Sequence, residues 1–177
     1  MKWVKKRLGD ICKIVGGGTP STQNKDYYKD GTIPWITPKD LSINKSKYIQ
    51  RGQRNITEKG LKSCSAKIIP KGSILFSSRA PIGYIAITKN NLSTNQGFKN
   101  LIPNNNISNI FLYYCLSFNK NKIILSASGT TFKEISGTEI ANITIQIPVD
   151  KKDQIKITKI LDYIDQKIDI NNKINDN

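Results

Sequence analysis

Residues 140–150 read IANITIQIPVD, and this stretch separates two different kinds of sequence. From Ile140 to Ile147 isoleucines alternate with polar residues, which predicts a half-buried strand that the following proline ends. Asp150 then stands where the N-cap residue of a helix is expected. We therefore predict one domain over residues 1–148 and a separate helical segment over residues 149–177.

The segment after the proline has the spacing of one long C-terminal coiled-coil helix. About 25 residues at ~1.5 Å rise per residue give a rod of roughly 37 Å. A heptad seam begins at Gln154, ends at Asn175, and places these residues on one face: Ile157, Leu161, Ile164, Ile168 and Asn171. Such a seam either packs against its own domain or pairs with another helix, and the composition leaves both open. Asparagines within a seam suit a helix pair that needs a fixed register.

The first 148 residues predict an irregular α+β domain. Short strands are expected over Ser73–Phe76 and Ile82–Thr88, separated by a polar turn. Thr57 is positioned to cap a short helix and Ser108 a longer one. Because no βαβ rhythm is present, we expect mixed α and β elements rather than a doubly wound parallel sheet.

The charge of the chain is distributed unevenly. Residues 149–177 hold six Lys and six Asp, so the whole net charge of +15 lies in residues 1–148. No acidic residue occurs between Glu58 and Glu134. A Lys-, Asn- and Ile-rich genome bias explains many lysines but not the missing acids. The pattern therefore favours a polyanionic partner, with nucleic acid as the prime candidate.

The residue types exclude several kinds of catalysis. The chain has no histidine, which removes Ser–His and Cys–His nucleophile pairs and His-ligated zinc. The glycine-rich run at residues 16–18 lacks the Gly-Lys-Ser/Thr ending of a phosphate-binding loop. The three cysteines are far apart and odd in number, which suggests structural thiols in a reducing cytoplasm. Because no long apolar run is present either, we expect a cytoplasmic protein with no metal site and no membrane span.

The candidate nucleic-acid contacts lie in turns that are rich in Arg, Lys, Asn, Gln and Thr. Arginine and carboxamide side chains can make bidentate bonds to base edges, whereas lysines more often hold phosphates. The candidates are Thr37, Lys39, Arg51, Arg54, Arg79, Asn95, Gln96, Lys99, Thr130, Thr131 and Lys133. Each turn taken alone is more typical of an ordinary solvated loop. Because all of these turns lack acidic residues except for Asp40, together they favour a shared basic surface.

Several motifs occur in the order typical of one family. They are LGDI (8–11), GGTPS (17–21), GTIPWITPKDL (31–41), PKGSILFSSRAPIG (70–83), TNQGF (94–98), SGTT (128–131) and ITIQIP (143–148). Together with the C-terminal helix, this ordered set resembles the specificity (S) subunits of type I restriction–modification systems. The resemblance spans essentially the whole chain.

The resemblance implies a target-recognition domain that reads half of an interrupted DNA site and has no catalytic residues or cofactor of its own. Methyltransferase (M) subunits would use S-adenosylmethionine to methylate adenine, and restriction (R) subunits would use ATP and Mg²⁺. An S subunit usually has two such domains and two helices, whereas this sequence has one of each. A half-S form that pairs as a homodimer through the helix is therefore expected. The alternative from the residues alone is a stand-alone basic nucleic-acid-binding protein or a carboxylate-dependent nuclease.

Overall fold

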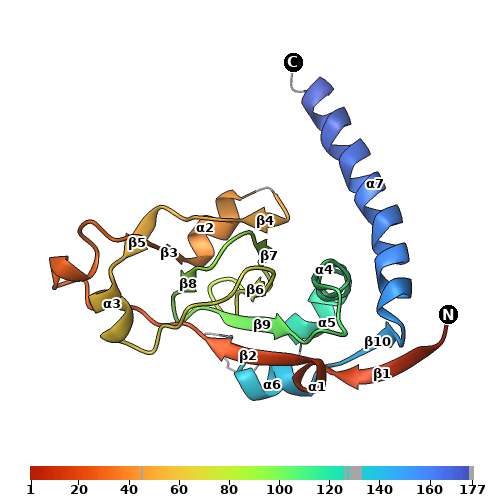
Figure 1. Ribbon diagram of the computed structural model, residues 1–177, viewed down its shortest axis with the longest axis horizontal. Helices are drawn as coiled ribbons and strands as arrows, with labels where there is room; N and C mark the ends of the chain where they lie inside the picture. The colour runs from red at the N-terminus through yellow and green to blue at the C-terminus, as the bar shows by residue number, and fades with distance from the viewer. Residues whose placement is uncertain (45, 126, 128–132, 176–177) are drawn as a thin grey trace.

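In the computed structural model, the chain folds into a mixed α/β body from which one long helix extends (Figure 1). The structure describes residues 1–44, 46–125, 127 and 133–175. The strands are β1 (Trp3–Arg7), β2 (Cys12–Gly16), β3 (Ile33–Ile36), β4 (Tyr48–Ile49), β5 (Arg54–Ile56), β6 (Ile74–Phe76), β7 (Ile85–Thr88), β8 (Ser93–Thr94), β9 (Lys99–Pro103) and β10 (Thr144–Pro148). The helices are α1 (Leu8–Ile11), the 3-10 helix η1 (Lys25–Tyr27), α2 (Pro38–Ile43), α3 (Glu58–Lys62), α4 (Asn109–Phe118), α5 (Lys120–Leu125), α6 (Gly137–Asn142) and α7 (Lys151–Asn175).

Among the described residues, the strands form three small sheets rather than one large one. A five-stranded sheet has the order β2-β9-β6-β7-β4, and a three-stranded sheet has the order β5-β3-β8. The two ends of the body meet in a two-stranded antiparallel sheet, in which Val4 of β1 faces Ile147 of β10. This pairing brings the start of the chain to the base of α7.

The main core lies between the five-stranded sheet and the helices that cover it. Ile74 and Phe76 of β6 pack with Leu112 and Leu116 of α4, and all four side chains are at most 1% exposed. A second cluster of buried side chains surrounds Phe98. The predicted α+β class is thereby confirmed.

Local capping signals place α3, α4 and α7 where the sequence predicts them. The Thr57 hydroxyl accepts the N–H of Gly60 at the start of α3, and the Ser108 hydroxyl accepts the N–H of Phe111 at the start of α4. Asp150 accepts the N–H of Lys152 through its side chain at 2.8 Å, as expected of the N-cap of α7.

The strand predicted over Ile140–Ile147 is wrong in its first half. Residues 137–142 instead form α6, because Ser136 and Glu139 make a capping box that satisfies the first turn of a helix. The expected strands over Ser73–Phe76 and Ile82–Thr88 are shorter and become β6 and β7. Alternating isoleucines therefore identified β10 correctly but not where it begins.

The long helix α7 is present, but the two halves of the predicted seam differ in how deeply they are buried. Gln154 is fully buried in the body, and Ile157 packs against the main core. Ile164 and Ile168 are 48% and 51% exposed, on the part of α7 that rises away from the body in Figure 1. The beginning of the seam thus packs on its own domain, whereas Ile164 and Ile168 are exposed. Pairing of the seam with another helix stays a prediction. Gln154 is a core position rather than a position open to such pairing, because its side chain is buried in the body.

Candidate nucleic-acid interface

The first candidate loop lies at the start of α2. Thr37 and Asp40 form a capping box, in which the Thr37 N–H and hydroxyl both donate to one Asp40 oxygen at 2.7 Å. Asp40 is only 8% exposed, and its other oxygen accepts the N–H of Gln53 at 2.8 Å. This buried carboxylate therefore ties the loop that carries Arg51 and Arg54 to the start of α2.

Three of the predicted contacts share one small depression. Thr37, Lys39 and Arg54 line a pocket of about 250 Å³, together with Trp35, Asp40 and Gln53. Lys39 and Arg54 are exposed, so their cationic groups are available to a ligand that covers the pocket. The Asp40 carboxylate instead accepts hydrogen bonds from Thr37 and Gln53. Among the described residues it forms no ion pair with Lys39 or Arg54.

The loop at Asn95 and Gln96 lies directly beside the first. The Asn95 N–H donates to the carbonyl of Ile36 at 2.9 Å, which brings it next to Thr37. The Thr19 hydroxyl donates to the side-chain oxygen of Gln96. A Cβ atom on Gly17 would lie 2.0 Å from the Asn95 carbonyl oxygen, so only glycine permits this close approach. The glycine-rich run therefore supports the candidate loop.

Arg79 and Lys99 meet at a single carboxylate. Glu134 binds the Arg79 guanidinium at 3.5 Å and the Lys99 ammonium at 3.1 Å. Backbone bonds hold these segments together: the Ser78 N–H donates to the Gly97 carbonyl at 2.8 Å, and the Ile135 N–H donates to the Ser78 carbonyl at 3.0 Å. In the sequence, Glu134 is the first acidic residue after the acid-free stretch. Sequence reasoning missed its role as a counter-ion, and this position is the one feature of the sequence that could have indicated it.

The structure thus joins the candidate loops into one continuous series. The loop at residues 51–54 contacts the start of α2, which adjoins the loop at 95–97, which in turn adjoins Ser78 and Ile135. Lys133, next to Glu134 in sequence, is exposed. Thr130 and Thr131 lie outside the described residues. We use the name basic loop series for the described loops, together with the adjoining ends of α2, β5 and β9, that carry Thr37, Lys39, Arg51, Arg54, Arg79, Asn95, Gln96, Lys99 and Lys133.

The described residues offer little support for a metal or a thiol nucleophile. Within residues 1–44, 46–125, 127 and 133–175, no three His, Cys, Asp or Glu side chains gather as metal ligands. Burial raises the pKa of the Cys12 and Cys115 thiols to about 12 each, which disfavours the reactive thiolate. No helix among the described elements is long and apolar enough to span a membrane.

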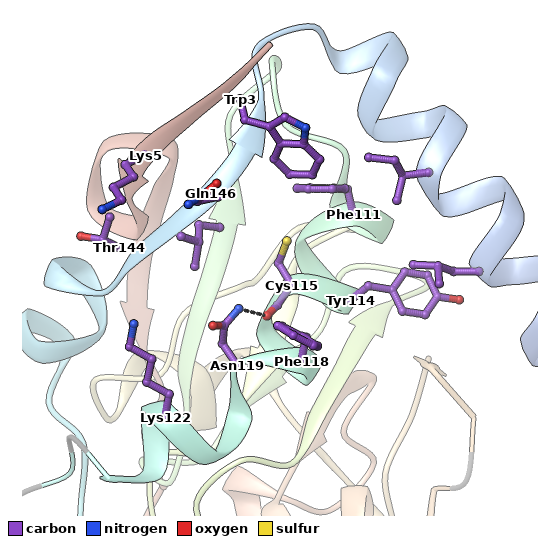
Figure 2. Close-up of a pocket in the computed structure, with 13 residues that line it drawn as sticks. Trp3, Lys5, Phe111, Tyr114, Cys115, Phe118, Asn119, Lys122, Thr144 and Gln146 are labelled. Atoms are coloured by element: carbon purple, nitrogen blue, oxygen red, sulfur yellow. Dashed lines mark hydrogen bonds between the residues drawn. The ribbon is translucent and has the colours of Figure 1, made fainter. Parts of the chain in front are cut away.

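A second surface lies between the body and the base of α7. A groove of about 850 Å³ is bounded by β1, α4, β10 and α7, and Ile157 and Leu161 contribute its α7 side. Figure 2 shows the Trp3 and Phe111 side chains close together on this surface, with ring centroids 6.4 Å apart. The predicted partner-helix residues therefore divide: Ile157 and Leu161 face the groove, whereas Ile164, Ile168 and Asn171 are exposed.

The chain is similar to curated specificity subunits along nearly its whole length. It is 46% identical over 176 residues to the type I restriction enzyme MjaIX specificity subunit of Methanocaldococcus jannaschii, covering 98% of this chain and 40% of that protein. It is 31% identical over 166 residues to the EcoR124I/EcoR124II specificity subunit of Escherichia coli, covering 90% of this chain and 40% of that one. The chain therefore spans about 40% of the length of these relatives.

Solved structures share the fold. A chain from a study of complex assembly and conformational transition of the type I R-M system superposes with a TM-score of 0.75 at 24% identity, covering 97% of this chain and 40% of that one. The HsdS subunit of Thermoanaerobacter tengcongensis gives a TM-score of 0.71 at 23% identity, covering 95% of this chain and 38% of that one. At this identity the superpositions establish the architecture alone.

The family match covers every residue of the sequence. Residues 1–177 match the family described as the type I restriction modification DNA specificity domain. This match and the 46% identity to a curated specificity subunit agree with each other. They give no support to a stand-alone nuclease. The chain belongs to the family of type I restriction modification DNA specificity domains.

Proposed function

We propose that this chain is the DNA-reading part of a type I restriction–modification specificity subunit, and that it recognises one half of a bipartite duplex site. The observation that carries this proposal is the basic loop series. Six cationic side chains stand on loops, or at the ends of the helices and strands beside them, that hydrogen bonds join together: Lys39, Arg51, Arg54, Arg79, Lys99 and Lys133. Cations in adjacent loops can follow a phosphate backbone, while Arg, Asn and Gln read base edges.

In this proposal the catalytic steps are carried out by partner subunits. The chain would be non-catalytic and hold no cofactor, while M subunits supply S-adenosylmethionine-dependent adenine methylation and R subunits supply ATP- and Mg²⁺-dependent translocation and cleavage. The curated relatives are named as specificity subunits of restriction enzymes, which supports this division of labour.

A second part of the proposal concerns α7. Ile164 and Ile168 are half exposed on a helix of 25 residues, and this apolar surface is costly to leave in water. We propose that it pairs with α7 of a second copy. Two copies related by a twofold axis would read an inverted repeat with a spacer between the half-sites.

Sequencing of methylated adenines tests the recognition function. The chain is produced with its M subunits in a host that lacks type I systems, and every methylated adenine in the genome is mapped. We expect one interrupted motif to be methylated. A triple Lys39→Ala/Arg54→Ala/Arg79→Ala variant should lose that motif, and Gln166→Ala, an exposed position on α7, should retain it. Methylation without a common motif, or DNA cleavage by the chain alone with a metal ion, would overturn the proposal.

A further inference from the structure

Four side chains from three separate parts of the chain meet at the middle of α7. The Lys47 ammonium lies 2.6 Å from Asp162 and 2.9 Å from Asp165, both on α7, and 2.5 Å from the Tyr114 hydroxyl on α4. The Tyr114 hydroxyl is itself 2.9 Å and 2.6 Å from the same two carboxylates. We call Lys47, Tyr114, Asp162 and Asp165 the α7 clamp.

The clamp matches donors to acceptors closely. A lysine ammonium has three N–H donors, and here each meets one oxygen atom. The two carboxylates stand three residues apart and so share one face of α7. The Lys47 side chain is only 16% exposed, and its ammonium also lies 4.7 Å from the centre of the Tyr114 ring. Partial burial strengthens these contacts compared with those of an exposed surface pair.

The clamp is attached to the body and not merely to a flexible loop. Lys47 immediately precedes β4, and its carbonyl accepts the N–H of Ile87 in β7 at 2.8 Å. Tyr114 lies on α4, whose Phe111, Leu112 and Leu116 are buried in the main core. Both partners of α7 are thus fixed to the five-stranded sheet.

A second anchor holds the base of the same helix. The buried Gln154 side chain accepts the Ser108 N–H at 2.8 Å and donates to the carbonyl oxygens of Pro148 at 3.1 Å and Asn106 at 3.3 Å. Gln154 precedes Asp165 by about 16 Å along the helix, at ~1.5 Å rise per residue. A rod held at one point can swing, but a rod held at two separated points has a defined direction.

We propose that the α7 clamp fixes the direction of α7 relative to the basic loop series, and thereby selects the spacer length of the DNA site that the assembled complex accepts. This proposal rests on the function proposed above. It assigns Lys47, Tyr114, Asp162 and Asp165 a positioning role in specificity without any contact to DNA.

Helix α7 is long enough that a small rotation of its axis moves its far end by several ångströms. From Gln154 to Asn175 the helix extends about 31 Å, so a swing of about 10° about Gln154 displaces its far end by about 5 Å. One base-pair step of duplex DNA is about 3.4 Å. A loosened clamp would therefore change the reach of the complex by one base pair or more while the half-site contacts stay intact.

A library of sites with varied spacers tests the clamp. Chain–M complexes methylate duplexes that carry the wild-type half-sites with the spacer shortened or lengthened by single base pairs, and methylation of each duplex is counted. For the wild-type complex we expect one dominant spacer. Lys47→Met, which keeps the stem but loses the charge, should reduce the preference for that spacer at least about fivefold and leave the half-site sequence unchanged. Lys159→Met removes an exposed lysine from the same helix and should behave as wild type.

Two further variants distinguish a positioning role of the α7 clamp from a contribution of the clamp to the stability of the fold. Lys47→Arg keeps the charge and should retain most of the spacer preference. Tyr114→Phe keeps the half-buried ring but loses the hydroxyl, so it should broaden the spacer profile even if Lys47→Met folds poorly. A wild-type spacer profile in Tyr114→Phe and in folded Lys47→Met would overturn the clamp while leaving the proposed function standing. A wild-type complex that selects no bipartite site would overturn both.

Discussion

At the scale of single residues, the most informative feature is Glu134, which holds two cations of the basic loop series. Its carboxylate forms ion pairs with both Arg79 and Lys99. Both contacts are partly exposed, so each contributes little to folding and can be exchanged for a phosphate or base edge. The sequence identified the cations through the missing acids around them, but it gave no partner for either.

Arg79 should distinguish cognate from random DNA. Arg79→Ala is expected to reduce the difference in binding free energy between the two by ~1–3 kcal/mol if the guanidinium reads a guanine. Competition binding of the assembled complex at fixed salt measures that difference. Lys159→Ala, on the exposed face of α7, provides a control of equal charge change. An equal loss on cognate and random DNA would assign Arg79 to the phosphate backbone instead.

At the scale of elements, α7 combines a polar anchor at its base with a polar clamp at its middle. The groove side of the helix between them is apolar, through Ile157 and Leu161. Apolar contacts tolerate sliding and rotation, whereas hydrogen bonds with defined directions do not. The polar contacts therefore give this helix its orientation, and the apolar contacts give it most of its packing.

The base anchor should be a large single contribution to stability. Gln154→Ala leaves the Ser108 N–H and the Pro148 carbonyl without their side-chain partner in a buried site, and the Asn106 carbonyl without its partner in a partly buried one. We expect a loss of about 1–3 kcal/mol in the free energy of unfolding. Urea denaturation measures it, with Gln166→Ala on the exposed side of α7 as the control. Equal stability of the two variants would show that water replaces the Gln154 side chain at no cost.

The clamp should weaken in acid. Burial alone would raise the pKa of Asp165, but hydrogen bonds from Tyr114 and Lys47 outweigh burial and hold the pKa below its ordinary 3.8. For Lys47, burial works to lower the pKa, and the bonds to Asp162, Tyr114 and Asp165 raise it above its ordinary range, so the ammonium stays charged throughout. The stabilisation from Asp165 is therefore present above its ordinary pKa and is lost as the pH falls through its lower folded pKa.

Urea unfolding from about pH 6 down to about pH 3 measures this effect, because only a group with a shifted pKa links folding to pH. The wild-type chain should lose more stability over this range than Lys47→Met, in which Asp165 has already lost its cation. The Lys159→Met variant should follow wild type. Parallel pH profiles for wild type and Lys47→Met would contradict the assignment of the shift to the clamp.

At the scale of the whole molecule, charge and apolar surface lie in different places. The net charge of +15 belongs to residues 1–148, and the far half of α7 is neutral with exposed isoleucines. The body is thus suited to a polyanion and the helix to a protein partner. The domain division at residue 148 stays a prediction, since Gln154 and Ile157 of the second segment pack into the first.

Pairing of two copies should depend on the exposed half of the helix. Ile164→Ser together with Ile168→Ser should give a folded chain with less tendency to associate, because these side chains contribute more to an interface than to the body. Sedimentation at protein concentrations of tens of micromolar measures the oligomeric state. Ile43→Ser changes an isoleucine on α2 that is 60% exposed and should not affect association. A monomeric wild-type chain would contradict the pairing.

The sequence by itself determined the features that depend on near neighbours along the chain. Thr57, Ser108 and Asp150 cap helices through bonds that span two or three residues, so their positions can be read directly. Short strands between turns likewise predicted the α+β class. Turns rich in Arg, Lys, Asn, Gln and Thr supplied the candidate residues of the basic loop series, whose contact with DNA stays a prediction. Even this local reading failed at Ile140, where the capping box of α6 outweighed the alternation of apolar residues.

Only the tertiary structure decided how distant segments meet. Gln154 bonds to Ser108 across 46 residues, and Lys47 reaches Asp162 and Asp165 across 115 and 118 residues. No spacing rule links such positions, because the partner of a buried polar group depends on which strands and helices pack beside it. The sequence therefore predicts that the long helix exists, whereas the folded body determines which half of its seam is buried and in which direction it extends.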